Sequence, residues 1–309
     1  MSKSALIRRL SDVDIRLVRI FMTVTEYGGF AASELELNIG RSTISRHVSD
    51  LETRIGLKLC HRGPSGFSLT PEGELVLAAA SRLLNSIEGF QSEIDNIHAE
   101  LTGTLRIGIF DQSSTNPNAN VHRALKSFDE LAKEVTLEIA LAPPSNLESR
   151  VIDGSLDLAI VPIHQQSSQL QYLPLYEEHM ALYCGTGHPL YNMDPETPLA
   201  DLMLSNHKYA GYAFNSPNMM AGQRLGIRRA ARVQEEEALL LLIQSGAYLG
   251  FLATHVAEPF LLDGRLKSVS AAKTGYTSTF AVATRKKPIP DRKTLEFVEC
   301  LKLAHDYKA

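Results

Sequence analysis

The chain has 309 residues, and 44% of them are hydrophobic, so two or three folded units with cores of their own are expected. Its three Cys are too few and too widely spaced for a disulfide framework. The N-terminus lacks the apolar stretch of a signal peptide, and no apolar run approaches the roughly 20 residues of a membrane span. A soluble protein of the cytoplasm is therefore predicted.

The net charge of −4 is unevenly distributed along the chain. Residues 1–70 contain ten Lys and Arg against seven Asp and Glu, a balance of +3, which leaves −7 for the remainder. A nucleic-acid interface is therefore to be sought in the first 70 residues.

This basic segment predicts three helices. Apolar spacing predicts the first helix over about 12–26 and a short second helix over 31–37. Asn38 is expected to end the second helix, because Asn tolerates the left-handed conformation found at helix ends. A third helix follows at Arg41 after a three-residue turn. Two short helices joined in this way, the second exposed and basic, are typical of a helix-turn-helix.

The third predicted helix, RSTISRHVSDLE, has two different faces. Ile44, Val48 and Leu51 form an apolar stripe at helical spacing. The opposite face carries small hydroxyls and cations without a carboxylate before Asp50, which suits phosphates and base edges in the major groove. Taken alone, this segment is equally consistent with an ordinary surface helix and with a DNA-recognition helix. The neighbouring segments favour the DNA-recognition helix. The predicted DNA-contacting residues on it are Arg41, Ser42, Thr43, Ser45, Arg46, His47 and Ser49.

Residues 57–70 predict a β-hairpin with its turn at 63–66. His61 and Arg62 are expected at the tip. A plain hairpin loop is the alternative. Beside a helix-turn-helix we favour a wing, in which Arg62 contacts phosphate or the minor groove.

A long helix is predicted from Pro71 to about residue 102. Its start combines a hydroxyl cap, a Pro in the first position and an acidic first turn. Apolar residues then alternate in steps of four and three, which is a heptad seam. Packing on its own chain is one reading. We favour pairing with a second subunit, because such motifs usually read two half-sites. Gly103 is expected to end the helix and act as a hinge. The predicted dimerisation residues are Leu83, Ile87, Phe90, Ile94 and Ile97.

Strands and helices alternate after residue 104. Strands at 105–110, 135–141 and 156–161, with helices at 118–133 and 146–154 between them, predict a parallel sheet with helices on both faces. The other predicted strands are 172–178, 179–185, 209–214, 248–253 and 277–285. The other predicted helices are 235–246, 254–264 and 291–306, and residues 230–234 are expected to lead into the first of these. The strands at 172–178 and 179–185 are assigned to a second lobe.

Residues 15–74, which include ISRHVSDLETRIGLKL, RGPSGFSLT and TPEGE, resemble the N-terminal domain of the LysR-type transcriptional regulators. Two departures stand out. Ser33 and Glu34 replace an Ala pair that is usual there, and Cys60 replaces a Phe. Glu34 is expected either to loosen the helix packing or to point to solvent. The C-terminal part resembles the effector domain of the same family more loosely, in IDGSLDLAIV, CGTGHPL and residues 245–253.

The resemblance implies three parts. They are an all-α winged helix-turn-helix domain at 1–70, a linker and dimerisation helix at 71–102, and an α/β effector domain at 103–309. The effector domain is expected to have two lobes, like periplasmic binding proteins, with the chain crossing between them twice. Lobe I would comprise 103–162 and 267–309, and lobe II 163–266. The effector would bind in the cleft between them, and effector domains would join dimers into a tetramer.

Ligands of open α/β sheets bind at the carboxyl ends of the strands, where three loops are expected. The first loop, 113–116, is expected to matter most, because its hydroxyls precede a helix whose N–H groups can hold an anion. Asp111 at its rim hints at an amine on the ligand. For the other two loops, ligand contact and ordinary loop composition are equally good readings. The predicted effector-binding residues are Ser113, Ser114, Thr115, Asn116, Pro144, Ser145, Asn215 and Ser216.

Motifs of catalysis do not appear in the sequence: there is no Gly-rich phosphate loop, no GxSxG and no HExxH. Cys184 and His188 are four residues apart, but a zinc site needs further ligands. Neither an enzyme, nor a cofactor, nor a metal site is expected.

The sequence thus predicts a cytoplasmic transcriptional regulator that binds double-stranded DNA and is switched by a small-molecule effector. It is expected to act as a homodimer or homotetramer, with RNA polymerase as a further candidate partner and no role at a membrane. The alternative is a cytosolic small-molecule-binding protein whose N-terminal helices contact other proteins. Salt-dependent binding to duplex DNA separates the two.

Overall fold

The computed structural model describes residues 10–63, 66–97, 101–110, 113–194 and 197–306. The chain divides into two compact units, Met1–Phe90 and Gln91–Ala309. Within the described ranges, no helix is both long enough and apolar enough to cross a membrane.

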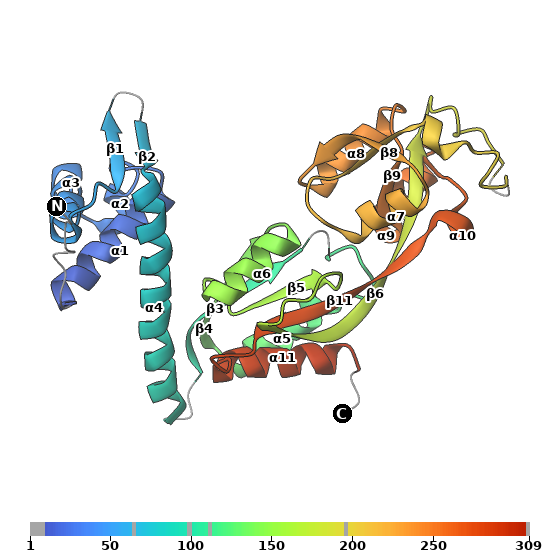
Figure 1. The fold of residues 1–309 in the computed structure, drawn as a ribbon. Coiled ribbons are helices and arrows are strands. Elements are labelled where there is room, and N and C mark those ends of the chain that lie inside the picture. The colour runs from blue at the N-terminus through green and yellow to red at the C-terminus, as the bar shows by residue number, and fades with distance from the viewer. Residues whose placement is uncertain (1–9, 64–65, 98–100, 111–112, 195–196, 307–309) are drawn as a thin grey trace. The chain divides into compact units, whose positions relative to one another are not determined.

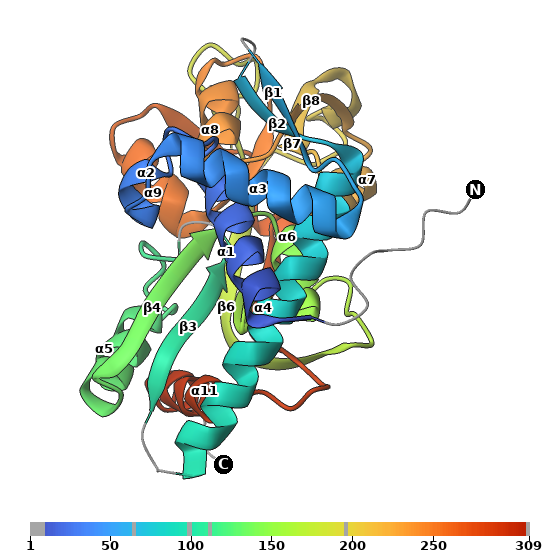
Figure 2. The ribbon, with the colours of Figure 1, turned by 90° about the vertical axis from the view of Figure 1, so that its left-hand side faces the viewer.

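The N-terminal unit is built on three helices, α1 (Asp12–Glu26), α2 (Glu34–Leu37) and α3 (Arg41–Ile55). The first and third agree with the predicted spans, and α3 lies across α1 (Figure 2). The second starts later than predicted, because the residues before it form turns. Asn38 has a φ of 51°, the left-handed helix end that the sequence predicts. The core between the helices includes Leu17, Phe21, Val24, Ile44, Val48 and Leu51.

Ser33 and Glu34, the departures from the family pattern, both have structural roles. The buried hydroxyl of Ser33 donates to the carbonyl of Gly29 at 2.8 Å. The Glu34 carboxylate accepts the backbone N–H of Arg41, the first residue of α3. Glu34 therefore does not simply point to solvent, as one of the two expectations had it. The Glu34 carboxylate satisfies the backbone N–H of Arg41, which has no partner within the helix because it lies in the first turn.

An ion pair joins α1 to α3. The Asp14 carboxylate, whose side chain is 1% exposed, accepts a hydrogen bond from Arg54 Nε at 2.5 Å. It also accepts the backbone N–H of Ser11 at 2.9 Å and the Ser11 hydroxyl at 2.6 Å. The Arg54 hydrogen bond above all, and then those from Ser11, hold the pKa of Asp14 well below its usual range. The start of α1 is thereby fixed to the last turn of α3.

The predicted hairpin is present as β1 (Cys60–Gly63) and β2 (Gly66–Leu69), antiparallel with Cys60 opposite Leu69. The turn residues 64–65 lie outside the described residues. The prediction that His61 and Arg62 lie at the tip is wrong, because the strand pairing extends to Gly63. They lie within β1, opposite Ser68 and Phe67.

Helix α4 (Pro71–Ile97) follows the hairpin. The Thr70 hydroxyl accepts the N–H of Gly73 at 2.9 Å and donates to the carbonyl of Lys58 at 2.6 Å, so the helix starts in close contact with the chain before β1. The prediction that Gly103 ends this helix is wrong. Gly103 is the second residue of β3 and pairs with Val135, because the strand starts at Thr102.

Lobe I of the C-terminal unit is a sheet with helices on both faces (Figure 1). Strands β3 (Thr102–Ile109), β4 (Glu134–Leu141) and β5 (Leu158–Pro162) are parallel, as predicted. Helices α5 (Val121–Leu131) and α11 (Arg292–Ala304) share one core with this sheet. Helix α6 (Pro144–Asp153) packs in a separate core with β5.

Two long strands connect lobe I with lobe II, β6 (Leu170–Gly185) and β11 (Tyr276–Arg285), which pair antiparallel (Figure 1). The prediction of two strands within lobe II is therefore wrong. The first half of β6 pairs with β11, which in turn lies beside β5 in the sheet. This half of β6 contributes Tyr176 to the lobe I core. The segment contains no turn, and Pro174 is accommodated where the register shifts, as a bulge allows. Residue 163 is thus not where lobe I ends.

Lobe II continues from the second half of β6. Strands β9 (Gly250–Ala253) and β10 (Leu266–Ser268) pair with β6, and β7 (Lys208–Tyr212) pairs in parallel with β8 (Arg228–Val233). The helices of lobe II are α7 (Pro217–Arg224), α8 (Glu236–Gln244), α9 (Thr254–Leu262) and α10 (Ala271–Thr274), with a 3-10 turn at Leu204–Asn206. The sequence did not predict α7, β8, β10 or α10.

Candidate functional site

Helix α3 presents two sharply different faces. Ile44, Val48 and Leu51 are fully buried in the core of the N-terminal unit. Of the seven predicted DNA-contacting residues on this helix, Arg41, Ser42, Thr43 and Arg46 are exposed, and Ser45, His47 and Ser49 are half-buried. The Ser49 hydroxyl donates to the carbonyl of Ser45 at 3.0 Å, which ties it to the helix backbone. Two cations and two hydroxyls therefore remain on the solvent side.

A cavity lies between the two lobes of the C-terminal unit, at the carboxyl ends of β3 and β7. It is lined by Phe110 and Pro144 from lobe I and by Asn215 and Ser216 from lobe II. Three of the eight predicted effector-binding residues thus meet there, namely Pro144, Asn215 and Ser216. Ser145 does not line it.

Two residues that line this cavity each carry a buried polar atom that has no hydrogen-bond partner among the described residues. Ser216 is 4% exposed, and its Oγ makes no hydrogen bond within the described part of the chain. Ser216 precedes α7, yet its hydroxyl does not cap the helix. The Nε2 atom of His164 is likewise buried without a partner there. Because buried polar groups are normally hydrogen-bonded, such atoms favour a ligand site.

The first loop, 113–116, lies beside this cavity and does not line it. Ser113 and Ser114 line a neighbouring hollow that shares Phe110 and Glu236 with the cavity. Thr115 and Asn116 line a second hollow, which shares Glu178 with it. The prediction that a helix begins directly after this loop is wrong. Turns continue to Asn120, and α5 starts at Val121.

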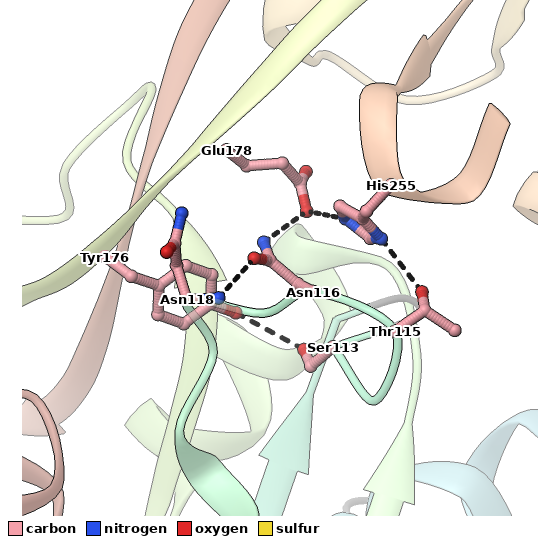
Figure 3. Close-up of polar contacts among 7 residues, drawn as sticks. All are labelled: Ser113, Thr115, Asn116, Asn118, Tyr176, Glu178 and His255. Atoms are coloured by element: carbon pink, nitrogen blue, oxygen red, sulfur yellow. Dashed lines mark hydrogen bonds and ion pairs between the residues drawn. The ribbon is translucent and has the colours of Figure 1, made fainter. Parts of the chain in front are cut away.

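Side-chain hydrogen bonds hold this loop against the crossing strand β6 and against α9 (Figure 3). The Thr115 hydroxyl lies 2.8 Å from Nδ1 of His255, and His255 Nε2 lies 2.9 Å from Oε1 of Glu178. The same Glu178 oxygen accepts a hydrogen bond from Asn116 Nδ2 at 3.2 Å. The Ser113 hydroxyl lies 3.3 Å from that of Tyr176. Lobe I, lobe II and the crossing strand are thus joined by one set of polar contacts.

Cys184 and His188 lie in the core of lobe II. Burial raises the pKa of the Cys184 thiol to about 11 and lowers that of His188 to about 4. Nδ1 of His188 accepts the backbone N–H of Leu190 at 3.1 Å, which is a structural role. No group of three or more potential metal ligands occurs among the described residues.

Sequence reasoning missed most residues of the cavity, among them Phe110, His164, Glu178 and Glu236. Phe110 could have been found, because it follows a strand whose carboxyl end was expected to face the cleft. Glu178 was assigned to the end of a strand that is in fact continuous, and Glu236 belongs to a run of three acids that predicts only a helix start. No local pattern marks His164.

Two family models match the chain. A model described as a bacterial regulatory helix-turn-helix protein of the lysR family matches residues 15–74. A model described as a LysR substrate binding domain matches residues 98–305, which is more than half of the chain.

Relatives and solved structures agree with these matches. The transcriptional activator BauR of Pseudomonas aeruginosa is 34% identical over 97% of this chain and 98% of its own. Full-length CbnR in complex with its target DNA has a TM-score of 0.62 at 17% identity, over 94% of this chain and 99% of that one. A full-length OxyR variant from Pseudomonas aeruginosa has the same TM-score and identity, over 98% and 99%. The two structures show the fold, and the family models and the relative show that the chain belongs to the LysR family of DNA-binding transcriptional regulators.

Proposed function

We propose that the protein acts in the cytoplasm as a homo-oligomeric regulator, without enzymatic activity. In this proposal it reads an operator of two half-sites through α3 and responds to a small molecule bound between its lobes. The likeness to an activator favours activation, and so a contact with RNA polymerase. The observation that carries the effector site is a pair of buried atoms, Ser216 Oγ and His164 Nε2, which have no partner among the described residues and belong to residues that line the interlobe cavity.

The exposed face of α3 supports the proposed DNA contact. Arg46 is exposed on the turn between the buried Ile44 and Val48. Arg41, the first residue of the helix, is exposed as well. Because the opposite face is fixed in the core, these cations can reach a groove without unpacking the unit.

Arg46→Ala is expected to weaken binding to an operator, selected in vitro from random duplexes, by about 1–3 kcal/mol. The side chain supplies charge and hydrogen bonds without packing in the core, so circular dichroism should not change. Fluorescence anisotropy at fixed salt measures the effect. Arg228→Ala is the matched control, since it removes an equally exposed guanidinium from lobe II. Full operator affinity in Arg46→Ala would show that this face of α3 is not the reading face.

Ser216→Phe is expected to abolish the effect of any small molecule that acts through the cavity, because the larger side chain occupies the space beside Asn215. Thermal unfolding of the full chain, with and without each compound of a small-molecule panel, measures the response. The control is the double variant Ser114→Val, Thr115→Val, which alters only the neighbouring hollows. A response that survives Ser216→Phe and is lost in the control would move the effector to the first loop.

A further inference from the structure

Among the described residues that line the interlobe region, every Asp, Glu, Lys or Arg is acidic. The cavity and the two hollows beside it are lined by the carboxylates Glu177, Glu178, Glu235, Glu236, Glu237 and Glu258. None of the described residues that line these three spaces is Lys or Arg. Clefts lined by one sign of charge concentrate ligands of the opposite sign.

Two of these carboxylates line the cavity itself. Glu236 is 5% exposed and lies in the first turn of α8. The side chain of Glu178 is 13% exposed. His255 and Asn116 both contact its Oε1, so these two contacts leave Oε2 unused (Figure 3). An anionic ligand here would face two carboxylates with no lysine or arginine among the described lining residues to offset them, which is costly in a buried site.

Aromatic rings form much of the rest of the lining. Phe110 lies at the centre, with ring centroids 6.1 Å from Tyr212, 5.9 Å from Phe214 and 6.4 Å from Phe280. Tyr276 lines the cavity as well. Aromatic faces attract organic cations, and a site that combines several rings with carboxylates is the usual environment of a bound ammonium group.

The two buried atoms that have no partner among the described residues complete this site. Ser216 Oγ can accept a hydrogen bond, and His164 Nε2 can do so in one tautomer. A primary ammonium has three N–H donors and no acceptor, so it matches a hydroxyl, an imidazole and a carboxylate together.

We propose that the effector is a small organic amine, bound as its ammonium ion between Glu236, Glu178 and the aromatic rings around Phe110. The proposal rests on the proposed function, since it names the ligand class of the same cavity. In this proposal the ligand carries no carboxylate, because the described lining residues include two carboxylates and no Lys or Arg.

A matched series of four-carbon probes tests the class. The full chain is titrated with n-butylamine, 1,4-diaminobutane, butanol and butyrate, and binding is followed by calorimetry and by the unfolding temperature. Both amines are expected to bind and to raise the unfolding temperature, butanol to bind more weakly, and butyrate not to bind.

Two substitutions locate the ammonium. Glu236→Gln is expected to weaken amine binding about tenfold or more, because a buried charge pair is lost. Glu237→Gln is its control, with the same change one residue away on an exposed side chain that does not line the cavity. Ser216→Ala keeps the stability of the free protein, since its hydroxyl has no partner to lose within the described residues, and it too should weaken amine binding.

The outcomes separate this proposal from the function on which it rests. Binding of butyrate or butanol in preference to the amines, abolished by Ser216→Phe, would keep the cavity as the effector site and overturn the ligand class. Amine binding that persists in both Glu236→Gln and Ser216→Ala, or no amine binding at all, would also overturn it. The proposed function fails if the compounds that bind are all indifferent to Ser216→Phe.

Discussion

Gly73→Ala is expected to destabilise the N-terminal unit by about 3 kcal/mol and to remove operator binding with it. A Cβ atom at this position would lie 1.9 Å from the carbonyl oxygen of Leu59 and 2.9 Å from its carbon. Both are backbone atoms that cannot rotate away. The Thr70 hydroxyl, bonded to Gly73 and to Lys58, holds the helix start against this segment, so the added methyl must displace α4 or the hairpin.

Gly89→Ala is the matched control for this result, in the same helix. A Cβ atom there meets nothing within 4 Å. Since alanine is a better helix former than glycine, this change should leave the unit unaffected or stabilise it by up to about 1 kcal/mol. Thermal unfolding followed by circular dichroism compares the two variants. Equal stability of both would show that the chain before β1 can move away from α4.

Ile94→Glu is expected to separate the subunits and to weaken operator binding about 100-fold or more, because the avidity of two linked half-sites is lost. Phe90 and Ile94 are 63% and 41% exposed in the single chain, although both belong to the predicted heptad seam. Leu83 and Ile87 are half-buried, and the side chain of Ile97 lies outside the described residues. A carboxylate in a paired seam would face its own mate without compensation.

Sedimentation velocity measures this effect, and Ala78→Glu serves as the control. Ala78 is exposed on the same helix and lies nearly half a turn around it from the seam. Ala78→Glu therefore adds the same charge on the other face of the helix. An unchanged oligomer in Ile94→Glu would place the seam against its own chain and leave the mode of assembly to other surfaces.

Local pattern was enough for much of the N-terminal unit. Helices α1 and α3 depend on apolar spacing and on end residues such as Asn38, all within a few positions of one another. The close approach of Gly73 to Leu59 could not be predicted in this way, because it joins two elements on either side of the hairpin. The role of Glu34 was missed for a related reason, since its partner is a backbone group seven residues further on.

In the C-terminal unit, the parallel sheet was predicted from its alternation of strands and helices. The continuity of β6 was not predicted. A strand that passes from the core of one lobe to that of the other has no turn in its sequence that would mark the change. The composition of the cavity depends on the same crossing, which places Glu178 near the ends of β3 and β7. Sequence reasoning therefore anticipated two of the loops that line the cavity and missed most of the chemistry of its lining.

The paired crossing strands also set how the lobes can move. An antiparallel ladder resists sliding along its length, since each step would break several backbone hydrogen bonds, but it yields to twisting and bending. Between Phe280 and Ala281 its register is interrupted, and Phe280 lines the cavity. The most flexible point of this connection therefore borders the proposed effector cavity, so that a molecule bound there would stiffen or bend the strands that link the two lobes.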